Sequence, residues 1–302
     1  MHVAILSARA GWHIDELTRA LTERGHTTHV SRYEALVARL TERDGSALSS
    51  EGASLLQADA VLARIIPNGS LEQIVYRVDA LHWLEDRGIT VMNSPRAIER
   101  TVDKFYTTAL LREAGLPTPD TVVCEDVSEA VAAVAAMGDA VIKPIFGSMG
   151  HGMVRVSDPD VAFRIARSLE LARSVFYVQR VIDHGGRDIR AFVVGSQVIG
   201  AIERIAPAGD WRTNVARGGA ARPITLPAGW DHLAIAAAGA VGADYAGVDL
   251  IPAADGRVFV VEVNGIPGWQ GLQQATGIDV AAAIVEQLEH RVRSRAGATV
   301  ET

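Results

Sequence analysis

The chain has 302 residues, of which 48% are hydrophobic, and a formal net charge of −7. This length and apolar content predict a substantial core divided among two or three structural units. The acidic balance excludes a general attraction to nucleic acid or to an anionic membrane. The single cysteine, Cys124, excludes an intramolecular disulfide and fits the reducing cytoplasm.

The first part of the chain alternates between apolar strands and amphipathic helices. Strands are expected at 3–7, 28–30, 60–63 and 90–92, helices at 14–24, 33–40 and 71–87, and a polar surface loop at 45–54. This alternation favours a parallel sheet with helical crossovers, and we place such an α/β unit at 1–92. The chain start is typical of a buried strand rather than a signal peptide, and no apolar run reaches the ~18 residues of a membrane span.

The remainder predicts two further units. A helical stretch at 95–115 precedes a small α+β unit, which has strands at 121–124, 140–143 and 153–156 and helices at 128–137 and 158–168. A β-rich unit follows, with strands at 176–179, 188–194, 197–203, 245–251 and 258–263 and a closing helix at 280–292. The tail AGATVET is expected to be disordered. The fold class is therefore α/β with α+β C-terminal lobes.

An acidic pair interrupts the last two strands, in GVDLIPAADGRVFVVEVNG (247–265). A two-residue turn at Asp255-Gly256 places Asp249 opposite Glu262. Two facing carboxylates repel unless a cation lies between them, and Asn264 adds a neutral oxygen on the same face. These hard oxygen ligands suit magnesium or manganese. The alternative, a solvated acidic face on an edge hairpin, is disfavoured by the apolar residues beside each acid.

A second constellation is suited to phosphate. VIKPIFGSMGHG (141–152) carries Lys143 at the end of a strand, followed by Gly147, Gly150 and Gly152. Such glycines let backbone N–H groups approach phosphate oxygens. The lysine precedes the glycines, so this is not a Walker loop, and the flanking strands predict a hairpin lid. A plain turn remains open for the loop alone, and an ordinary surface role remains open for Lys104 on the preceding helix.

Arginines gather between these two constellations. In GGRDIRAFVVG (185–195), Asp188 and Arg190 share one strand face. In WRTNVARGGAAR (211–222), Arg212, Arg217 and Arg222 lie within eleven residues. Clustering of bidentate donors in an acidic protein indicates a specific anionic ligand, although a solvated loop is the alternative.

The chain resembles the ATP-grasp superfamily, and within it the RimK-type α-L-glutamate ligases. The resemblance rests on KPIFGSMGHG, VQRVIDHGGRDIRAFVVG, IERIAPAGDWRTNVARGGAA, AGVDL, VEVNGIPG and ATGIDVAAAIVEQLEHR. The resemblance covers nearly all of 95–292. It implies an N-terminal pre-ATP-grasp domain (1–92), a central lobe with a glycine-rich lid (93–178) and a C-terminal lobe with a metal site (179–295). It also implies that ATP lies between the last two lobes.

The resemblance also implies roles for individual residues. Lys143, Arg190 and Arg212 would be catalytic, and Asp249, Glu262 and Asn264 would bind two Mg²⁺ or Mn²⁺ ions. The substrate would contact Arg217, Arg222 and Gly265. The nucleotide would contact Lys104, Lys143, Gly147, Ser148, Gly150, Gly152, Gln179, Arg180, Val181, Asp188, Arg212, Thr213 and Asn214. One departure is Arg180, since the family often carries an acidic residue at this hinge; its role stays open.

The family activity is the ATP-dependent joining of an amino acid to a carboxylate acceptor through an acyl phosphate, with release of ADP. L-Glutamate is the expected amino acid, and the N-terminal lobe resembles relatives that glutamylate cofactors such as tetrahydromethanopterin. The alternatives are glutamylation of a protein C-terminus, a ligase for a different amine, and a non-catalytic nucleotide-binding protein. The last predicts lost lysines or metal ligands, and none is lost. Neither nucleic acid nor membrane is an expected partner, and a homo-oligomer is left open.

Overall fold

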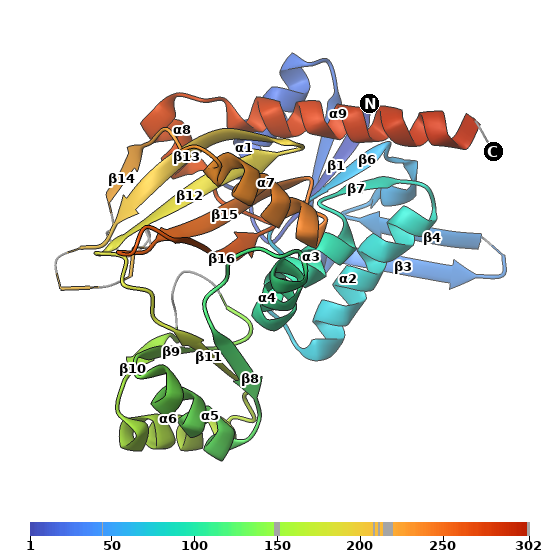
Figure 1. Cartoon of the computed structure of the whole chain (residues 1–302). Helices are drawn as coiled ribbons and strands as arrows, with labels where there is room; N and C mark the ends of the chain where they lie inside the picture. The colour runs from blue at the N-terminus through green and yellow to red at the C-terminus, as the bar shows by residue number, and fades with distance from the viewer. Residues whose placement is uncertain (44, 148–151, 208, 211, 214–219, 301–302) are drawn as a thin grey trace.

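The computed structural model describes residues 1–302 except 44, 148–151, 208, 211, 214–219 and 301–302. These residues form four sheets flanked by helices (Figure 1). Three of the sheets organise the body of the molecule, and the fourth is a small projecting hairpin sheet near the N-terminus. Among the described residues, none of the helices combines the length and apolar character that a membrane span requires.

The N-terminal sheet is entirely parallel, in the order β2-β1-β6-β7, as the sequence predicts. Parallel neighbours need crossover connections, and helices provide two of them. Residues 3–6 of the central strand are buried, as expected for a strand covered on both faces. The elements are β1 (His2–Ser7), α1 (Trp12–Glu23), β2 (Thr27–Arg32), β6 (Ala60–Ala63), α2 (Leu71–Asp86) and β7 (Thr90–Met92).

Two predictions in this region are wrong. The expected helix at 33–40 is a short 3-10 turn, η1 (Tyr33–Ala35), followed by strand β3 (Leu36–Thr41). The expected loop at 45–54 contains β4 (Gly45–Ser50) and β5 (Ala53–Ser54), followed by η2 (Leu55–Gln57). Gly45 has φ of +74°, which lets the chain reverse and pair β3 with β4. The apolar spacing at 33–40 does not mark a helix face, because Leu40 is 73% exposed.

The central lobe is an antiparallel sheet, in the order β10-β9-β11-β8, covered by two helices. The helical stretch before it is two helices rather than one, because Asp103 caps the second through the Tyr106 N–H (3.0 Å). The elements are α3 (Pro95–Val102), α4 (Lys104–Glu113), β8 (Thr121–Cys124), α5 (Val127–Met137), β9 (Ala140–Lys143), β10 (Val154–Val156), α6 (Pro159–Leu171) and β11 (Phe176–Arg180).

The C-terminal sheet is antiparallel, in the order β14-β13-β12-β15-β16. The sequence predicts its four longer strands but misses β14, and it wrongly assigns 176–179 to this unit, because that segment is β11 of the central sheet. The tail is also predicted wrongly, because the last helix continues to Val300. The elements are β12 (Arg187–Val194), β13 (Gln197–Ile205), β14 (Ala220–Pro223), α7 (Trp230–Val241), β15 (Tyr245–Pro252), β16 (Val258–Asn264), α8 (Gln270–Thr276) and α9 (Val280–Val300).

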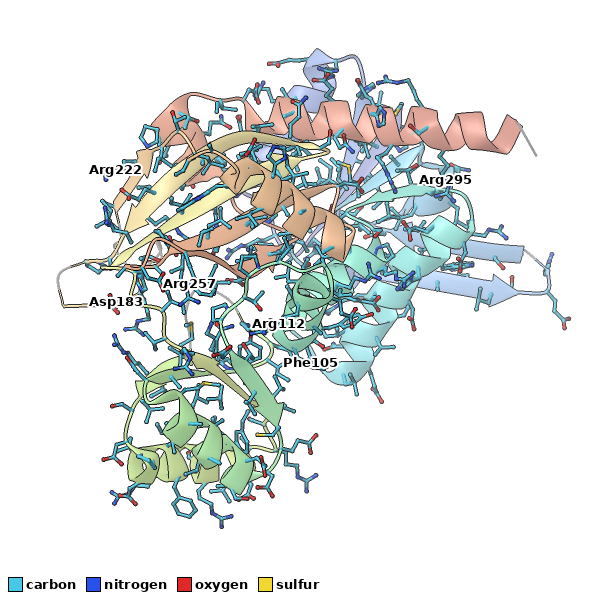
Figure 2. All side chains as sticks on the ribbon, in the orientation of Figure 1. Phe105, Arg112, Asp183, Arg222, Arg257 and Arg295 are labelled. Atoms are coloured by element: carbon cyan, nitrogen blue, oxygen red, sulfur yellow. The ribbon has the colours of Figure 1, made fainter. Side chains whose placement is uncertain are left out.

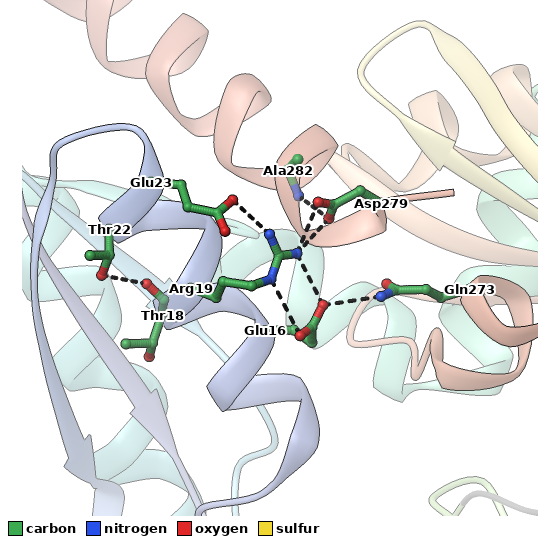
Figure 3. A network of polar contacts seen from close by, with 8 residues as sticks. All are labelled: Glu16, Thr18, Arg19, Thr22, Glu23, Gln273, Asp279 and Ala282. Atoms are coloured by element: carbon green, nitrogen blue, oxygen red, sulfur yellow. Dashed lines mark hydrogen bonds and ion pairs between the residues drawn. The ribbon is translucent and has the colours of Figure 1, made fainter. Parts of the chain in front are cut away.

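The N-terminal and C-terminal sheets share a core, whereas the central lobe has its own. One apolar cluster joins β1, α1 and β6 to β12, β13 and α9. Arg19 of α1 reinforces this junction, since it contacts Glu16, Glu23 and Asp279 (Figure 3). A separate cluster fills the central lobe between its sheet and α5 and α6, and Figure 1 shows that lobe as a distinct body.

Candidate nucleotide and metal site

The acidic pair faces across β15 and β16 as predicted, but the turn is not the predicted one. Asp249 is directly opposite Glu262. The hairpin turns through three residues, since Ala253 N–H donates to Arg257 O (2.8 Å) and Gly256 has φ of +85°. An irregularity in the ladder next to Asp249 then shifts the register by one residue. The bulge compensates for the longer turn, so the two carboxylates still face each other.

Asp249 is buried and is bound by two arginines. Arg190 donates to both of its carboxylate oxygens (2.7 and 2.7 Å), and Arg204 approaches Oδ2 at 2.8 Å. Burial alone would raise the pKa of Asp249, but the two guanidiniums lower it to about 2. Glu262, in contrast, is half-buried and has no hydrogen-bond or ion-pair partner among the described residues.

These groups fit a magnesium ion by their chemistry. Glu262 offers an unpaired carboxylate, and Asp249 retains lone-pair capacity beyond its three arginine contacts. The amide oxygen of Asn264, on the same face, accepts only from Ile266 N–H (3.0 Å). Within the described part of the chain, no three His, Cys, Asp or Glu side chains gather into a metal cluster. A metal would therefore be held by two carboxylates and an amide, with other ligands completing the shell.

The sequence analysis missed Arg204, which connects the acids. It is 4% exposed and forms a bidentate ion pair with Asp188 (2.6 and 2.6 Å) while contacting Asp249. Thr213 donates to Asp188 as well (2.5 Å), so both Asp188 oxygens are occupied. The available signal was a charged pair, Glu203-Arg204, near the end of the mostly apolar strand β13, where Arg204 lies opposite Asp188.

The two lysines converge beside the glycine loop. Lys143 ends β9, and its ammonium donates to Gln179 Oε1 (2.6 Å). Burial lowers the pKa of Lys143 to about 8, and Glu262 opposes that shift. Lys104, the first residue of α4, donates to the carbonyl oxygens of Ile145 (3.1 Å) and Gly147 (2.8 Å). Burial also lowers the pKa of Lys104.

Strands β9 and β10 pair antiparallel, so the glycine segment joins the two strands of a hairpin as expected. Gly147 and Gly152 have φ of +133° and +73°, a region that side chains disfavour. Ser148 and Gly150 lie outside the described residues. Whether the segment acts as a lid stays a prediction.

The hinge arginine has a structural role in this conformation. Arg180 pairs with Asp120 (3.0 Å) and donates to Met137 O (2.9 Å), which ties the end of β11 to the segment before β8 and to α5. Val181 N–H donates to Asp139 O (3.0 Å). The residue for which the family pattern differs therefore holds the central lobe together.

The three clustered arginines, Arg212, Arg217 and Arg222, have different positions in the structure. Arg212 pairs with Asp210 (2.9 Å). Arg222, on β14 at the outer edge of the sheet (Figure 2), pairs with Glu203 and contacts it directly across the ladder. Glu203 and Arg204 are adjacent in β13, so their side chains point to opposite faces, and Arg222 lies on the face away from Asp249. Asn214 and Arg217 lie outside the described residues.

Buried polar contacts fix the loop after β16 against the N-terminal sheet. Asn93 donates to the carbonyl oxygens of Tyr245 (2.8 Å) and Gly265 (2.5 Å), and its Oδ1 accepts from the N–H groups of Asp244 (2.7 Å) and Tyr245 (3.1 Å). A side chain at Gly265 would collide with Thr101, which explains the glycine. Arg64 donates to Pro267 O (3.0 Å).

Comparison with known proteins gives a consistent result. The family model described as RimK-like ATP-grasp domain matches residues 101–288, and the model described as RimK PreATP-grasp domain matches residues 1–98. The tetrahydromethanopterin:alpha-L-glutamate ligase of Methanosarcina acetivorans is 37% identical, covering 92% of this chain and 95% of that protein. A probable alpha-L-glutamate ligase of Trichodesmium erythraeum is 33% identical, covering 96% of each. The solved ATP-grasp ligase PsnB, complexed with minimal precursor, Mg and ADP, has a TM-score of 0.73 at 24% identity, covering 96% of this chain and 98% of that chain.

Proposed function

This chain belongs to the RimK-like ATP-grasp family of ATP-dependent, amide-bond-forming ligases, and we propose that it joins L-glutamate to a carboxylate acceptor through an acyl phosphate. The observation that carries this proposal is the facing pair Asp249/Glu262, with Glu262 unpaired, on the same sheet face as Arg190. Glu262 raises the pKa of Lys143 against the effect of burial, which supports our proposal that the acids and the phosphate-binding lysines belong to one site.

The proposed chemistry has two steps. An acceptor carboxylate oxygen attacks the γ-phosphorus of ATP, and the bond to the β,γ-bridging oxygen breaks to release ADP. The amine of glutamate then attacks the acyl carbon, loses a proton, and inorganic phosphate leaves. Lys143, Arg190 and Arg212 would offset the charge on the transferred phosphoryl group. Bound Mg²⁺ or Mn²⁺, as two ions held by Asp249, Glu262 and Asn264, would supply further charge neutralisation.

The nucleotide would lie between the central and C-terminal lobes. Lys104 and Lys143 would contact its phosphates, and the backbone of 179–181 would hold adenine. Asp188, enclosed by Arg204 and Thr213, would position Thr213 beside the ribose. Gly147, Ser148, Gly150, Gly152, Arg212 and Asn214 would complete the nucleotide site. The lobes proposed from sequence at 1–92, 93–178 and 179–295 need one adjustment: β11 (Phe176–Arg180) pairs within the central sheet, so we place that boundary after Arg180.

We propose a tetrahydromethanopterin-like cofactor as the acceptor, because a relative with that activity is 37% identical over 92% of the chain. The glutamate carboxylates would be bound by Arg217, Arg222 and Gly265. Arg222 pairs with Glu203 on the sheet face away from Asp249, so Arg217→Ala is expected to have the larger effect on glutamate binding.

ADP release, measured across a panel of amino acids and carboxylate acceptors, tests the proposal. Release should require glutamate together with an acceptor. Arg217→Ala should weaken glutamate affinity by about tenfold or more, as expected for a lost bidentate contact. Arg222→Ala is the matched comparison. Equal use of glutamine or alanine would contradict the glutamate assignment while leaving the ligase class intact.

A further inference from the structure

Gln179 has a buried side chain that the family resemblance does not explain. The resemblance assigns a role in adenine binding to the backbone of Gln179 and none to its side chain. Gln179 is 3% exposed. Its Oε1 accepts from the Lys143 ammonium (2.6 Å). Its amide nitrogen donates to Tyr177 Oη (3.0 Å) and to Thr121 Oγ1 (3.0 Å). Both of its N–H groups and its oxygen are therefore engaged.

The strand register produces this arrangement. Tyr177 lies directly opposite Lys143, and Gln179 lies directly opposite Thr121. Residues 177 and 179 share one face of β11, so all four side chains lie on one face of the central sheet. Because side chains alternate between the two faces of a strand, the pairing of β8, β11 and β9 places Thr121, Gln179, Tyr177 and Lys143 next to one another.

The network fixes which way the amide points. An ammonium only donates, so it needs the oxygen of Gln179, while the amide nitrogen needs two acceptors. The hydroxyls of Thr121 and Tyr177 provide them. Rotating the amide by half a turn would direct its N–H groups at a cation, and the buried ammonium would lose its acceptor.

The network also connects the central lobe to the helix that carries the other lysine. Tyr177 Oη lies 2.7 Å from Thr108 Oγ1, and Thr108 in turn donates to Lys104 O (2.8 Å). The Lys143 ammonium also lies 5.7 Å from the centre of the Tyr177 ring. Both lysines are therefore linked to the hydroxyl that orients Gln179.

We propose that Gln179 is a positioning residue for phosphate binding: its amide, oriented by Thr121 and Tyr177, holds the Lys143 ammonium where the nucleotide phosphates bind. This inference rests on the proposed function, because it requires a nucleotide at this site. Gln179 offers a neutral acceptor, so it solvates the buried ammonium without cancelling its charge. A carboxylate in the same place would neutralise the cation that the phosphates need.

Comparing the affinities for MgADP and adenosine distinguishes a role in phosphate binding from a general structural role. Gln179→Met keeps the volume and removes the three hydrogen bonds. MgADP affinity should fall about tenfold, as expected for one lost hydrogen bond to a charged group. Adenosine affinity, measured by competition, should stay within about twofold, because adenosine has no phosphate for Lys143 to bind. Equal losses for both ligands would overturn the inference.

A double-mutant cycle tests whether Gln179 acts through Lys143. Once Lys143→Met has removed the ammonium, Gln179→Met should cost no further MgADP affinity. Additive losses would overturn the inference alone, whereas a wild-type protein that binds no MgADP would overturn the proposed function and the inference with it. If Gln179→Met does not fold, Thr121→Val combined with Tyr177→Phe removes the orienting acceptors instead and should give the same ligand pattern.

A matched control uses Thr118. Its hydroxyl is buried and has no hydrogen-bond partner in the part of the chain that the structure describes, although Thr118 lies close to Thr121 in the chain. Thr118→Val should therefore leave MgADP affinity unchanged, whereas Thr121→Val should weaken it. Indistinguishable effects of the two substitutions would contradict the orienting role of Thr121.

Discussion

The two junctions of this molecule are built differently. The N-terminal and C-terminal sheets share one apolar cluster and are bound by Asn93, whose side chain makes four hydrogen bonds to backbone groups. The central lobe has a separate core, and Lys104 is among its polar contacts to the rest of the molecule, through Ile145 and Gly147. The first junction is thus made largely by buried groups, whereas the second combines the buried contact between Tyr177 and Thr108 with a lysine that we propose a phosphate can compete for.

This difference indicates where the molecule is rigid and where it can respond to a ligand. Buried backbone groups cannot give up their partners without a cost of about 1–3 kcal/mol each. A lysine bonded to loop carbonyls can exchange them for phosphate oxygens at little cost. We therefore expect the N- and C-terminal sheets to behave as one body, against which the central lobe closes.

The largest effect is expected at the acidic pair Asp249/Glu262, which lies in the C-terminal sheet. Glu262→Gln and Asp249→Asn should each lower turnover by about a thousandfold or more, because both remove a charge that a metal would need. Asp255→Asn, at the exposed turn of the same hairpin, is the control. Steady-state ADP release at saturating magnesium measures the effect. Near-normal turnover in either site variant would remove the pair from the mechanism.

The next largest effect is expected on stability at the fixed junction. Asn93→Ala should lower the free energy of unfolding by about 3 kcal/mol, because it strands buried carbonyl and N–H groups. Urea unfolding followed by tryptophan fluorescence reports on this region, since Trp269 belongs to the shared cluster. Asn68→Ala, whose side chain has no hydrogen-bond partner among the described residues, is the control. Similar losses in the two variants would argue against a fixed junction.

A pH dependence should arise at the same junction. His13 packs against Trp269 and accepts its backbone N–H (3.1 Å), and burial together with Arg64 lowers the pKa of His13 to about 4. Between pH 6.5 and 4 the unfolded chain binds a proton that the folded protein does not, so stability should fall with falling pH in that window. His13→Gln should show a shallower decline. An unchanged slope would show that His13 is not responsible.

The smallest effect is expected at the surface of the junction. Arg19→Ala should cost less than about 1 kcal/mol, because its ion pairs with Glu23 and Asp279 are solvent-exposed and the pair with Glu16 is only partly buried (Figure 3). The loss should shrink as salt is added. Arg39→Ala, an exposed arginine without an ion pair among the described residues, is the control. A loss as large as that of Asn93→Ala would mean that surface charge, not burial, holds the two sheets together.

The sequence predicts the sheets well and the side-chain partners poorly. The assumed two-residue turn at Asp255-Gly256 placed Asp249 opposite Glu262, but that pairing is produced by a three-residue turn and a bulge together. The sequence could not show that Arg204 lies between Asp188 and Asp249, because this depends on the three-dimensional register of β12, β13 and β15. The helix predicted at 33–40 is wrong because Tyr33 and Leu36 are buried whereas Val37 and Leu40 are exposed on the projecting hairpin, so the apolar spacing does not mark one buried helix face.

The site residues divide in the same way. Lys104 and Lys143 reach the glycine loop from elements far apart in the chain, a convergence that only the family resemblance could suggest. Arg222 was grouped with Arg212 by its nearness in sequence, and β14 carries it to the opposite sheet face. Where a segment after a loop forms another strand of the sheet, the face on which a residue lies depends on the strand register. Its nearness in sequence to other arginines does not predict that face.

The isotope content of the released phosphate tests the central claim most directly. The protein would be incubated with ATP, magnesium, glutamate and tetrahydromethanopterin carrying ¹⁸O in its terminal carboxylate. An acyl phosphate requires a carboxylate oxygen to leave with phosphorus, so each amide formed should release one phosphate bearing one ¹⁸O atom. Unlabelled phosphate accompanying amide formation would contradict the acyl-phosphate account, and steady-state ADP release that glutamate does not stimulate would contradict glutamate as the amine.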